Sequence, residues 1–196
     1  LPKDQIIPGE KLEMGSSVKV YVSKLEIGPK GPFIMLSRSH YGFVKRLLEI
    51  EIPELSDGTI MLYSVARDAG SRSKIAVYTE YTNVDPIGAV IGEKGRRIAN
   101  VLKELSGEKI DVIAYSDDME VFIANALSPA KNLNVSITDE KKKEALAVAE
   151  GDNLSLAIGK KGQNVRLAAR LTHYRIDVKT PEQVKEEKID LTNALS

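Results

Sequence analysis

The stretch that decides the fold occurs twice, as Ile91-Gly92-Glu93-Lys94-Gly95 and again as Ile158-Gly159-Lys160-Lys161-Gly162. A second match follows each copy, because Ile110-Asp111-Val112 returns as Ile176-Asp177-Val178 at a spacing that differs by a single residue. Repetition of this kind is the signature of one structural unit used more than once. The chain is therefore better explained by two copies of a module than by a single large fold.

Each copy stands in the same order of expected elements, read from helical and two-residue hydrophobic periods. The order is helix, strand, strand, short helix, glycine loop, helix, strand. For the first copy we expect these elements at 41–55, 59–65, 74–80, 85–91, 96–105 and 109–115, with a polar turn at 67–72. For the second copy we expect them at 119–127, 133–138, 146–148, 153–158, 163–171 and 174–179, with a polar turn at 139–143.

A Gly-x-x-Gly string is weak evidence by itself, and the chain contains a third one at Gly28-Pro29-Lys30-Gly31. That string lies between two expected strands and beside further prolines, which indicates a plain hairpin turn. The other two strings join two helices after a pair of strands. This context is typical of the KH module, whose loop clamps about four nucleotides of single-stranded RNA by their backbone. The alternative is a tight helix–helix turn that binds nothing.

The residue types in the two loops suit a phosphate. Glycines let the chain turn sharply and let an anion approach the backbone, and the loop leads into a helix N-terminus that attracts negative charge. Lys160 and Lys161 add positive charge to the second loop. Glu93 is unfavourable in the first loop, although Arg96 and Arg97 follow it closely. We therefore expect the second loop to hold phosphate more firmly.

A polar stripe follows the second loop, where Gln163, Arg166, Arg170 and His173 recur three or four residues apart along one side of the expected helix. This side faces RNA or, alternatively, is a solvated helix face. Bases would lie on an apolar floor formed by Ile158 and Ile176 in the second module and by Ile91 and Ile110 in the first. Aromatic residues are scarce, so stacking is not expected to supply most of the affinity.

Composition excludes several classes of protein. Lys plus Arg (28) equals Asp plus Glu (28), so any nucleic-acid binding must rest on a local basic surface. The chain has no cysteine and two histidines, which argues against disulfides, metal sites and cofactor sites. No membrane span or signal peptide is evident, and we expect a cytoplasmic protein. Phosphate-loop, nucleophile-elbow and zinc-protease motifs are absent, so we expect no enzyme.

The two ends of the chain read differently from the modules. Val18 to Val22 and Phe33 to Leu36 predict two strands around a turn rich in glycine and proline. A lone hairpin is barely stable in water, and the chain opens abruptly at Leu1-Pro2. We therefore expect the back half of a small β-barrel. The segment after Thr180 is rich in Glu and Lys and predicts a helical tail or linker.

Longer strings carry a family resemblance. Val65-Ala66-Arg67-Asp68-Ala69-Gly70-Ser71-Arg72-Ser73-Lys74-Ile75-Ala76-Val77 and Leu154-Ser155-Leu156-Ala157-Ile158-Gly159-Lys160-Lys161-Gly162-Gln163-Asn164-Val165-Arg166-Leu167-Ala168-Ala169 closely resemble the NusA family of bacterial transcription termination and antitermination factors. Asn125-Ala126-Leu127-Ser128-Pro129-Ala130 and Leu36-Ser37-Arg38-Ser39 are similar to that family as well.

The resemblance implies an α+β chain with a partial S1 (OB-type) β-barrel followed by two tandem prokaryotic-type (type II) KH domains. The implied domains are the partial S1 domain at 1–40, the first KH domain at 41–117, the second at 118–180 and a charged tail at 181–196.

The resemblance further implies contact with nascent RNA and with RNA polymerase and other elongation or termination factors, and control of pausing, termination and antitermination. Two departures from the family pattern are Glu93 in the first loop and Leu171-Thr172-His173-Tyr174 where the family has Gly-Trp. The residues expected to contact RNA are Ile91, Gly92, Glu93, Lys94, Gly95, Arg96, Arg97, Ile110, Ile158, Gly159, Lys160, Lys161, Gly162, Gln163, Asn164, Arg166, Arg170 and Ile176.

Two alternatives stay open. One is an RNA-processing or ribosome-associated KH protein; polynucleotide phosphorylase-like enzymes have one KH domain placed before S1, the reverse of the order expected here. The other is a protein-interaction scaffold whose KH folds no longer bind RNA. Lys160, Lys161 and Arg166 argue against the scaffold in the second module, whereas Glu93 leaves it open in the first.

Overall fold

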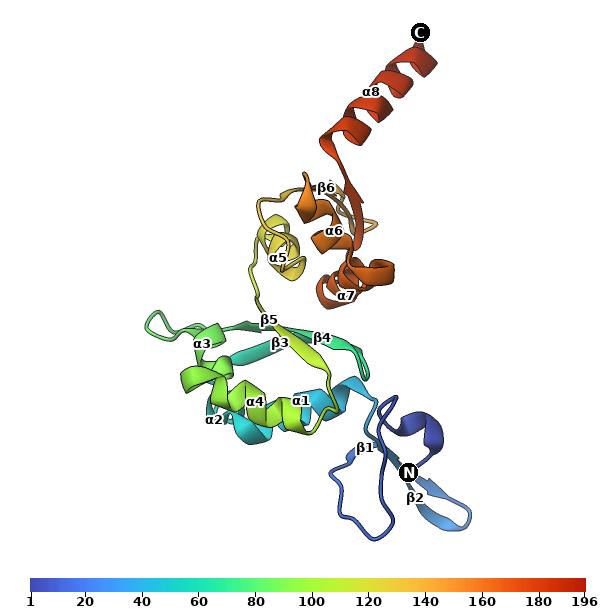
Figure 1. The fold of residues 1–196 in the computed structure, drawn as a ribbon, viewed down its shortest axis with the longest axis vertical. Helices are drawn as coiled ribbons and strands as arrows, with labels where there is room; N and C mark the ends of the chain where they lie inside the picture. The colour runs from blue at the N-terminus through green and yellow to red at the C-terminus, as the bar shows by residue number, and fades with distance from the viewer. The chain divides into compact units, whose positions relative to one another are not determined.

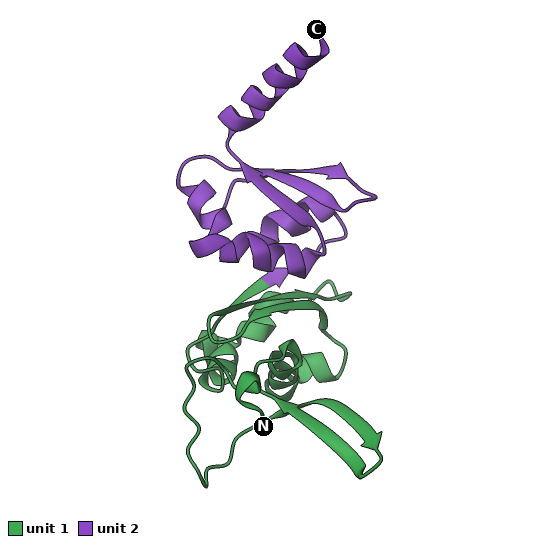
Figure 2. Cartoon of the chain, turned by 90° about the vertical axis from the view of Figure 1, so that its right-hand side faces the viewer, with its two compact units in different colours: residues 1–112 green, residues 113–196 purple.

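The computed structural model describes residues 1–196, which form two compact units, residues 1–112 and residues 113–196 (Figure 2). Each unit contains one three-stranded sheet, of order β3-β4-β5 in the first and β6-β7-β8 in the second. A separate two-stranded sheet, β1-β2, belongs to the first unit. The repeated order of elements expected from the sequence is confirmed.

The first unit opens with a 3₁₀ turn and a hairpin and continues into the first module, which we define as the elements from α1 to β5 (Figure 1). Its elements are η1 (Lys3–Gln5), β1 (Tyr21–Gly28), β2 (Gly31–Ser37), α1 (Tyr41–Glu51), α2 (Pro53–Ser56), β3 (Met61–Asp68), β4 (Arg72–Tyr78), α3 (Pro86–Ile91), η2 (Glu93–Gly95), α4 (Arg96–Lys103) and β5 (Lys109–Ala114).

The second module comprises the elements from α5 to β8, and a terminal helix follows it. Its elements are α5 (Met119–Ala126), β6 (Asn134–Asp139), β7 (Glu144–Val148), α6 (Asp152–Ile158), η3 (Lys160–Gly162), α7 (Gln163–Thr172) and β8 (Arg175–Lys179), and the terminal helix is α8 (Pro181–Leu195). β6 and β7 run antiparallel, whereas β7 and β8 run parallel. A parallel pair needs a crossover connection, and α6, the loop and α7 supply it.

The helices of the first module cover one face of its sheet, and the core lies between them (Figure 1). The helical spacing of apolar residues in α1 produces the buried stripe of Phe43, Val44, Leu47 and Leu48. α1 begins at a cap in which His40 Nδ1 accepts from the backbone N–H of Gly42 at 2.9 Å. The core of the first unit consists of Ile7, Phe43, Val44, Leu47, Leu48, Ile52, Ile60, Ile75, Val77, Val90, Val101 and Leu105.

The terminal helix α8 begins at a capping box. The Thr180 hydroxyl accepts from the backbone N–H of Gln183, and the Gln183 side chain accepts from the backbone N–H of Thr180. No residue of α8 is buried. The expected helical tail is confirmed. Every helix of the chain falls short of the length and apolar character that crossing a bilayer demands.

The N-terminal part of the chain corrects one expectation. The expected partial β-barrel is not observed: β1 and β2 form a hairpin, and no closed barrel is present. The hairpin leaves Leu25 65% and Ile27 89% exposed, because two strands alone cannot bury both faces of a sheet. The first strand begins at Tyr21, so most of the stretch 18–22 precedes it. Gly28 pairs with Gly31 across the turn, which confirms the hairpin reading of the third Gly-x-x-Gly string.

The β3–β4 hairpin corrects a second expectation. The polar turn is shorter than the expected 67–72, because β3 continues to Asp68 and β4 starts at Arg72. β4 also has five consecutive buried residues from Ser73 to Val77, so its burial does not alternate between two faces. Its polar members are buried because they have partners: the Lys74 ammonium donates to Asp111 at 2.8 Å.

Candidate nucleic-acid interface

The two Gly-x-x-Gly loops have the same backbone conformation although their middle residues differ. Gly92 has φ 78° and ψ 171°, and Gly159 has φ 76° and ψ 173°. The final glycines also match, with φ 72° and ψ 16° at Gly95 and φ 72° and ψ 14° at Gly162. The two modules thus present one loop geometry twice.

The first and second glycine of each loop serve different purposes. A Cβ atom on Gly159 would lie 2.6 Å from the Cβ of Asn164 and 2.8 Å from its backbone nitrogen. A Cβ on Gly92 would likewise lie 2.9 Å from the Cβ of Arg97. The second glycines have open space, with no atom within 4 Å at Gly95. The first glycine is therefore needed for close approach, and the second only for its positive φ.

The residue against each first glycine is the second residue of the following helix. We call Arg97 of α4 and Asn164 of α7 the anchor residues. Arg97 Nη1 donates to the carbonyl of Ala89 at 2.9 Å and to the Glu54 carboxylate at 2.8 Å. Asn164 Nδ2 donates to the carbonyls of Ala157 at 2.9 Å and of Leu127 at 3.0 Å. Each anchor residue thus ties its helix to the helix before the loop and to the end of an earlier helix.

The anchor residues differ from the RNA contacts that the sequence suggested. Asn164 is 2% exposed, so its side chain lies inside the module and cannot touch a bound chain. The guanidinium of Arg97 is occupied by Glu54, and the Arg97 side chain is 31% exposed. Spacing alone could not reveal this, because the acceptors Leu127 and Glu54 lie far away in the sequence.

The middle residues of both loops point their charges to solvent. Lys160 and Lys161 are exposed in η3, and Glu93 and Lys94 are exposed in η2. The exposed Arg166 turns back toward the loop, where its Nη1 donates to the carbonyl of Lys161 at 3.2 Å. The second loop thus carries lysines at both middle positions, whereas the first carries one acid and one base. Further exposed charges of the same two helices are Arg96 and Arg170.

The backbone of each loop offers fewer N–H groups to an anion than the sequence suggested. The N–H of Gly162 donates to the carbonyl of Gly159 at 3.1 Å, and the N–H of Gln163 donates to the carbonyl of Lys160. The same bond joins Gly95 to Gly92 in the first loop at 3.1 Å. These 3₁₀ bonds fix the loop but occupy donors, so lysine side chains carry more of the proposed phosphate contact.

The expected apolar floor is uneven. Ile91 is 36% exposed and available at the surface of the first module. Ile158 and Ile110 are half-buried. Ile176 is only 8% exposed, and it belongs to the core of the second module more than to its surface. The structure therefore brings three of these four isoleucines to partly open positions.

Two protein families match the two modules separately. A family described as the NusA-like first KH domain matches residues 38–115, and one described as the NusA-like second KH domain matches residues 119–186. The chain belongs to the NusA family.

Curated relatives agree with this assignment. The transcription termination/antitermination protein NusA of Halalkalibacterium halodurans is 48% identical over 186 residues, which cover 95% of this chain and 48% of that protein. NusA of Bacillus subtilis is 49% identical over 186 residues, covering 95% of this chain and 50% of that protein. The chain spans about half the length of these NusA proteins. A solved structure titled "Crystal structure of APE1850" covers 69% of this chain and 96% of that chain, at 24% identity and a TM-score of 0.49, too low to carry weight.

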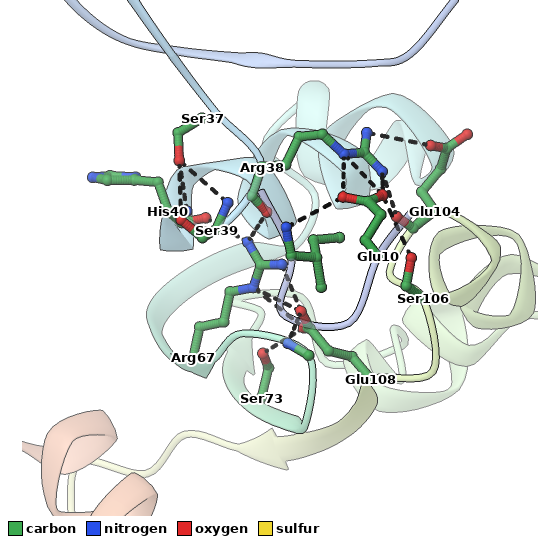
Figure 3. A network of polar contacts seen from close by, with 12 residues as sticks. Glu10, Ser37, Arg38, Ser39, His40, Arg67, Ser73, Glu104, Ser106 and Glu108 are labelled. Atoms are coloured by element: carbon green, nitrogen blue, oxygen red, sulfur yellow. Dashed lines mark hydrogen bonds and ion pairs between the residues drawn. The ribbon is translucent and has the colours of Figure 1, made fainter. Parts of the chain in front are cut away.

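The first NusA-like KH domain contains a buried ionic network that the sequence did not reveal (Figure 3). Arg67 Nε donates to the Glu108 carboxylate at 3.1 Å, and these side chains are 1% and 0% exposed. Arg67 Nη1 also donates to the carbonyls of Arg38 at 2.7 Å and of His40 at 2.8 Å. Arg67 therefore fixes the chain just before α1. The string containing Arg67 was part of the family resemblance, but its partner lies 41 residues further on.

The network continues to the N-terminal segment. Arg38 donates to the Glu10 carboxylate, with Nε 3.0 Å from Oε2, and both side chains are almost fully buried. Burial alone would raise the pKa of Glu10, but the hydrogen bonds and charge of Arg38 outweigh it, so the pKa lies below its usual value. The segment around residue 10 is therefore tied to the first module.

A second ionic cluster crosses the sheet of the first module. Asp111 on β5 accepts from Arg72 Nε at 2.8 Å and from Lys74 Nζ at 2.8 Å. Burial raises the pKa of Asp111, but the hydrogen bonds from Arg72 and Lys74 reverse the shift and lower it. Burial lowers the pKa of Lys74, and its bond to Asp111 opposes this only in part. The cluster links the central strand of the sheet, β4, to its neighbour β5.

Proposed function

We propose that this chain binds single-stranded RNA through its two Gly-x-x-Gly loops, as the RNA-gripping part of a transcription elongation factor that modulates pausing, termination and antitermination. The observation that carries the proposal is the closely matching conformation of the two loops, each held by an anchor residue and each open to solvent at its middle positions. The names of the curated relatives support the role in termination and antitermination.

Within this proposal the second loop is the stronger phosphate site. Its two lysines each add an attraction that weakens with salt, whereas Glu93 opposes an anion at the first loop. The contacting residues that we retain are those that are at least partly exposed and are not anchor residues. They are Ile91, Gly92, Glu93, Lys94, Gly95, Arg96, Ile110, Ile158, Gly159, Lys160, Lys161, Gly162, Gln163, Arg166 and Arg170.

We further propose the division of the chain into an S1-like segment at 1–40, KH domains at 41–117 and 118–180, and a tail at 181–196. The exposed apolar residues of the β1–β2 hairpin support an S1-like origin, because strands with such faces ordinarily lie in a larger sheet or barrel. RNA polymerase and other elongation factors are the proposed protein partners. The proposed role requires no catalysis, and the proposed location is the cytoplasm.

The test is the affinity for a labelled, unstructured RNA of about ten nucleotides, more than the roughly four that one KH loop clamps. The affinity is measured at two salt concentrations for the parent and for a Lys160→Asp, Lys161→Asp variant. Both positions are exposed, and an aspartate tolerates the positive φ of 54° at Lys161. The matched control is Lys185→Asp, Lys188→Asp, which makes the same charge change on the exposed face of α8.

We expect the parent to bind and to weaken with salt, the loop variant to lose most of its affinity, and the control to bind nearly as the parent does. Two lost phosphate contacts should also flatten the slope of log affinity against log salt by about 1.4, at roughly 0.7 per contact on a single strand. Equal losses in the loop variant and the control would mean that only total charge matters. A parent that does not bind RNA at all would favour the scaffold reading.

A further inference from the structure

Each anchor residue packs directly against the first glycine of its Gly-x-x-Gly loop, so its position affects the conformation of that loop. The first glycine lacks a Cβ, and the backbone and Cβ of the anchor residue occupy the space beside it. A shift of the anchor residue would therefore change the packing that holds the glycine backbone at ψ 171° in the first loop and 173° in the second. Two bonds hold each anchor in place, one to the helix before the loop and one to an element further back.

The two modules achieve this with different chemistry. In the second module the anchor is a neutral amide, fully enclosed, that donates to two backbone carbonyls. Its Oδ1 atom is buried without a hydrogen-bond partner. Leaving a buried acceptor unpaired is unfavourable. An apolar side chain would avoid that cost. The presence of the amide therefore indicates that its two donated hydrogen bonds, to Leu127 and Ala157, stabilise this part of the module.

In the first module the anchor is a cation at the surface. Arg97 and Glu54 are 31% and 30% exposed, and their ion pair is bidentate, with Nη2 3.3 Å from Oε1 in addition to the Nη1 bond. The hydrogen bond from its own backbone and that from Arg97 lower the pKa of Glu54, so the carboxylate is charged at neutral pH. Asn100, on the same helix as Arg97, donates to Glu51 at 2.7 Å and adds a second link to the end of α1.

We propose that Arg97 and Asn164 are the positioning residues of the two loops, and that Glu54 sets the loop of the first module through Arg97 without touching RNA. This inference rests on the proposed RNA binding. A contact of Arg97 with phosphate would make the opposite prediction for Glu54, because removing a competing carboxylate would then strengthen RNA binding. The two interpretations therefore predict opposite changes in RNA affinity when Glu54 is replaced.

The deciding variant is Glu54→Lys in the full chain, with affinity for the same labelled RNA of about ten nucleotides. The change removes one negative charge and adds one positive charge, so simple electrostatics predicts tighter binding. Repulsion of Arg97 predicts instead a loss of roughly three- to tenfold and shifts in the amide signals of Gly92 and Gly95. Glu80→Lys is the matched control, since it makes the same charge change at an exposed position of the same unit. We expect it to leave those glycine signals in place and to bind as tightly as the parent or tighter.

The second variant is Asn164→Ala, measured in the parent and in the Lys160→Asp, Lys161→Asp background. We expect roughly tenfold weaker binding in the parent and little further loss in the background, where the loop is already disabled. Equal losses in both backgrounds would show a general structural role and overturn the assignment of Asn164. Should Asn164→Ala unfold the second module, the Glu54→Lys result decides alone.

The two proposals fail separately. If the lysine-pair variant binds RNA as the parent does, the proposed function fails whatever the anchor variants do. If that variant loses binding while Glu54→Lys and Asn164→Ala bind like the parent, the loops contact RNA but the anchor residues do not position them. Tighter binding by Glu54→Lys, with unchanged glycine signals, would also overturn the inference and make Arg97 a direct contact.

Discussion

Alanine at the two glycines of one loop should have unequal effects on stability, and the structure gives the reason. Gly159 combines φ 76° with ψ 173°, a region of backbone space that is essentially restricted to glycine. Gly162 has φ 72° and ψ 14°, the left-handed helical region, which other residues enter at a moderate cost. The space around the two residues differs as well, since a Cβ at Gly162 meets only Arg166 Nη1, at 3.9 Å.

The magnitudes follow from these two differences. Gly162→Ala pays left-handed strain of about 1–2 kcal/mol and regains about 0.4–1 kcal/mol from the stiffer unfolded chain, so the net loss is about 1 kcal/mol. Gly159→Ala carries about 1–3 kcal/mol of strain in the glycine-only region. A Cβ there also meets Asn164 backbone nitrogen at 2.8 Å, and relieving such overpacking costs a further 1–3 kcal/mol or so. After the same gain of about 0.4–1 kcal/mol from the unfolded chain, we expect a net loss of about 3 kcal/mol.

The assay is urea unfolding followed by circular dichroism, because the chain has no tryptophan. The first module provides an internal repeat of the experiment, since Gly92→Ala should resemble Gly159→Ala and Gly95→Ala should resemble Gly162→Ala. Equal losses at the first and second glycines, or a larger loss at the second, would refute the close-packing argument. In that case the glycines would serve only to allow positive φ.

Three further predictions concern charge. Glu108→Gln leaves the Arg67 cation buried without its counterion and should cost about 3–5 kcal/mol in urea unfolding; a loss below about 1 kcal/mol would contradict the buried network, and the double variant Arg67→Met, Glu108→Leu should recover much of the loss. Glu93→Lys should tighten RNA binding several-fold and steepen the salt slope by about 0.7; an equal gain from Glu80→Lys would show that position does not matter. Because the pKa of Asp111 lies below its unfolded value of about 3.9, its stabilisation is complete above about pH 4 and is lost as the pH falls through the folded-state pKa. Acid unfolding curves should therefore be flatter for Asp111→Asn than for the parent, and identical curves would rule out the cluster as a source of acid sensitivity.

Several features could be predicted from the sequence because they depend on residues close together in the chain. The repeat and the helix–loop–helix around each glycine string follow from local periods and from the rules for glycine. The hairpin turn at Gly28 to Gly31 was equally readable. The single helix expected at 41–55 is instead divided at Ile52 into α1 and α2. Local signals were weaker for strand ends, since pairing with a neighbour decides where a strand stops. β3 and β4 extend further into their turn than expected and fall short of the expected ranges at their other ends.

The candidate site divides in the same way. The lysines at 160 and 161 were expected to add charge to the second loop, and the structure leaves them exposed, because a tight loop between helices keeps its middle residues at the surface. Asn164 and Ile176 were expected to contact RNA but lie inside the second module. Their neighbours in sequence give no hint of this, since the period of a helix or a strand places a residue on a face without telling which face the fold covers.

The sequence by itself thus determined the module, its duplication and the exposed charge of each loop, all of which rest on local spacing and on the backbone freedom of glycine. Only the tertiary structure decided which polar residues hold the loops and which are free to meet a ligand. Arg97 finds Glu54, Asn164 finds Leu127 and Arg67 finds Glu108 across long stretches of chain. Hydrogen bonds and ion pairs act over a few ångströms, so their partners are fixed by how the elements pack and cannot be read from the order of the residues.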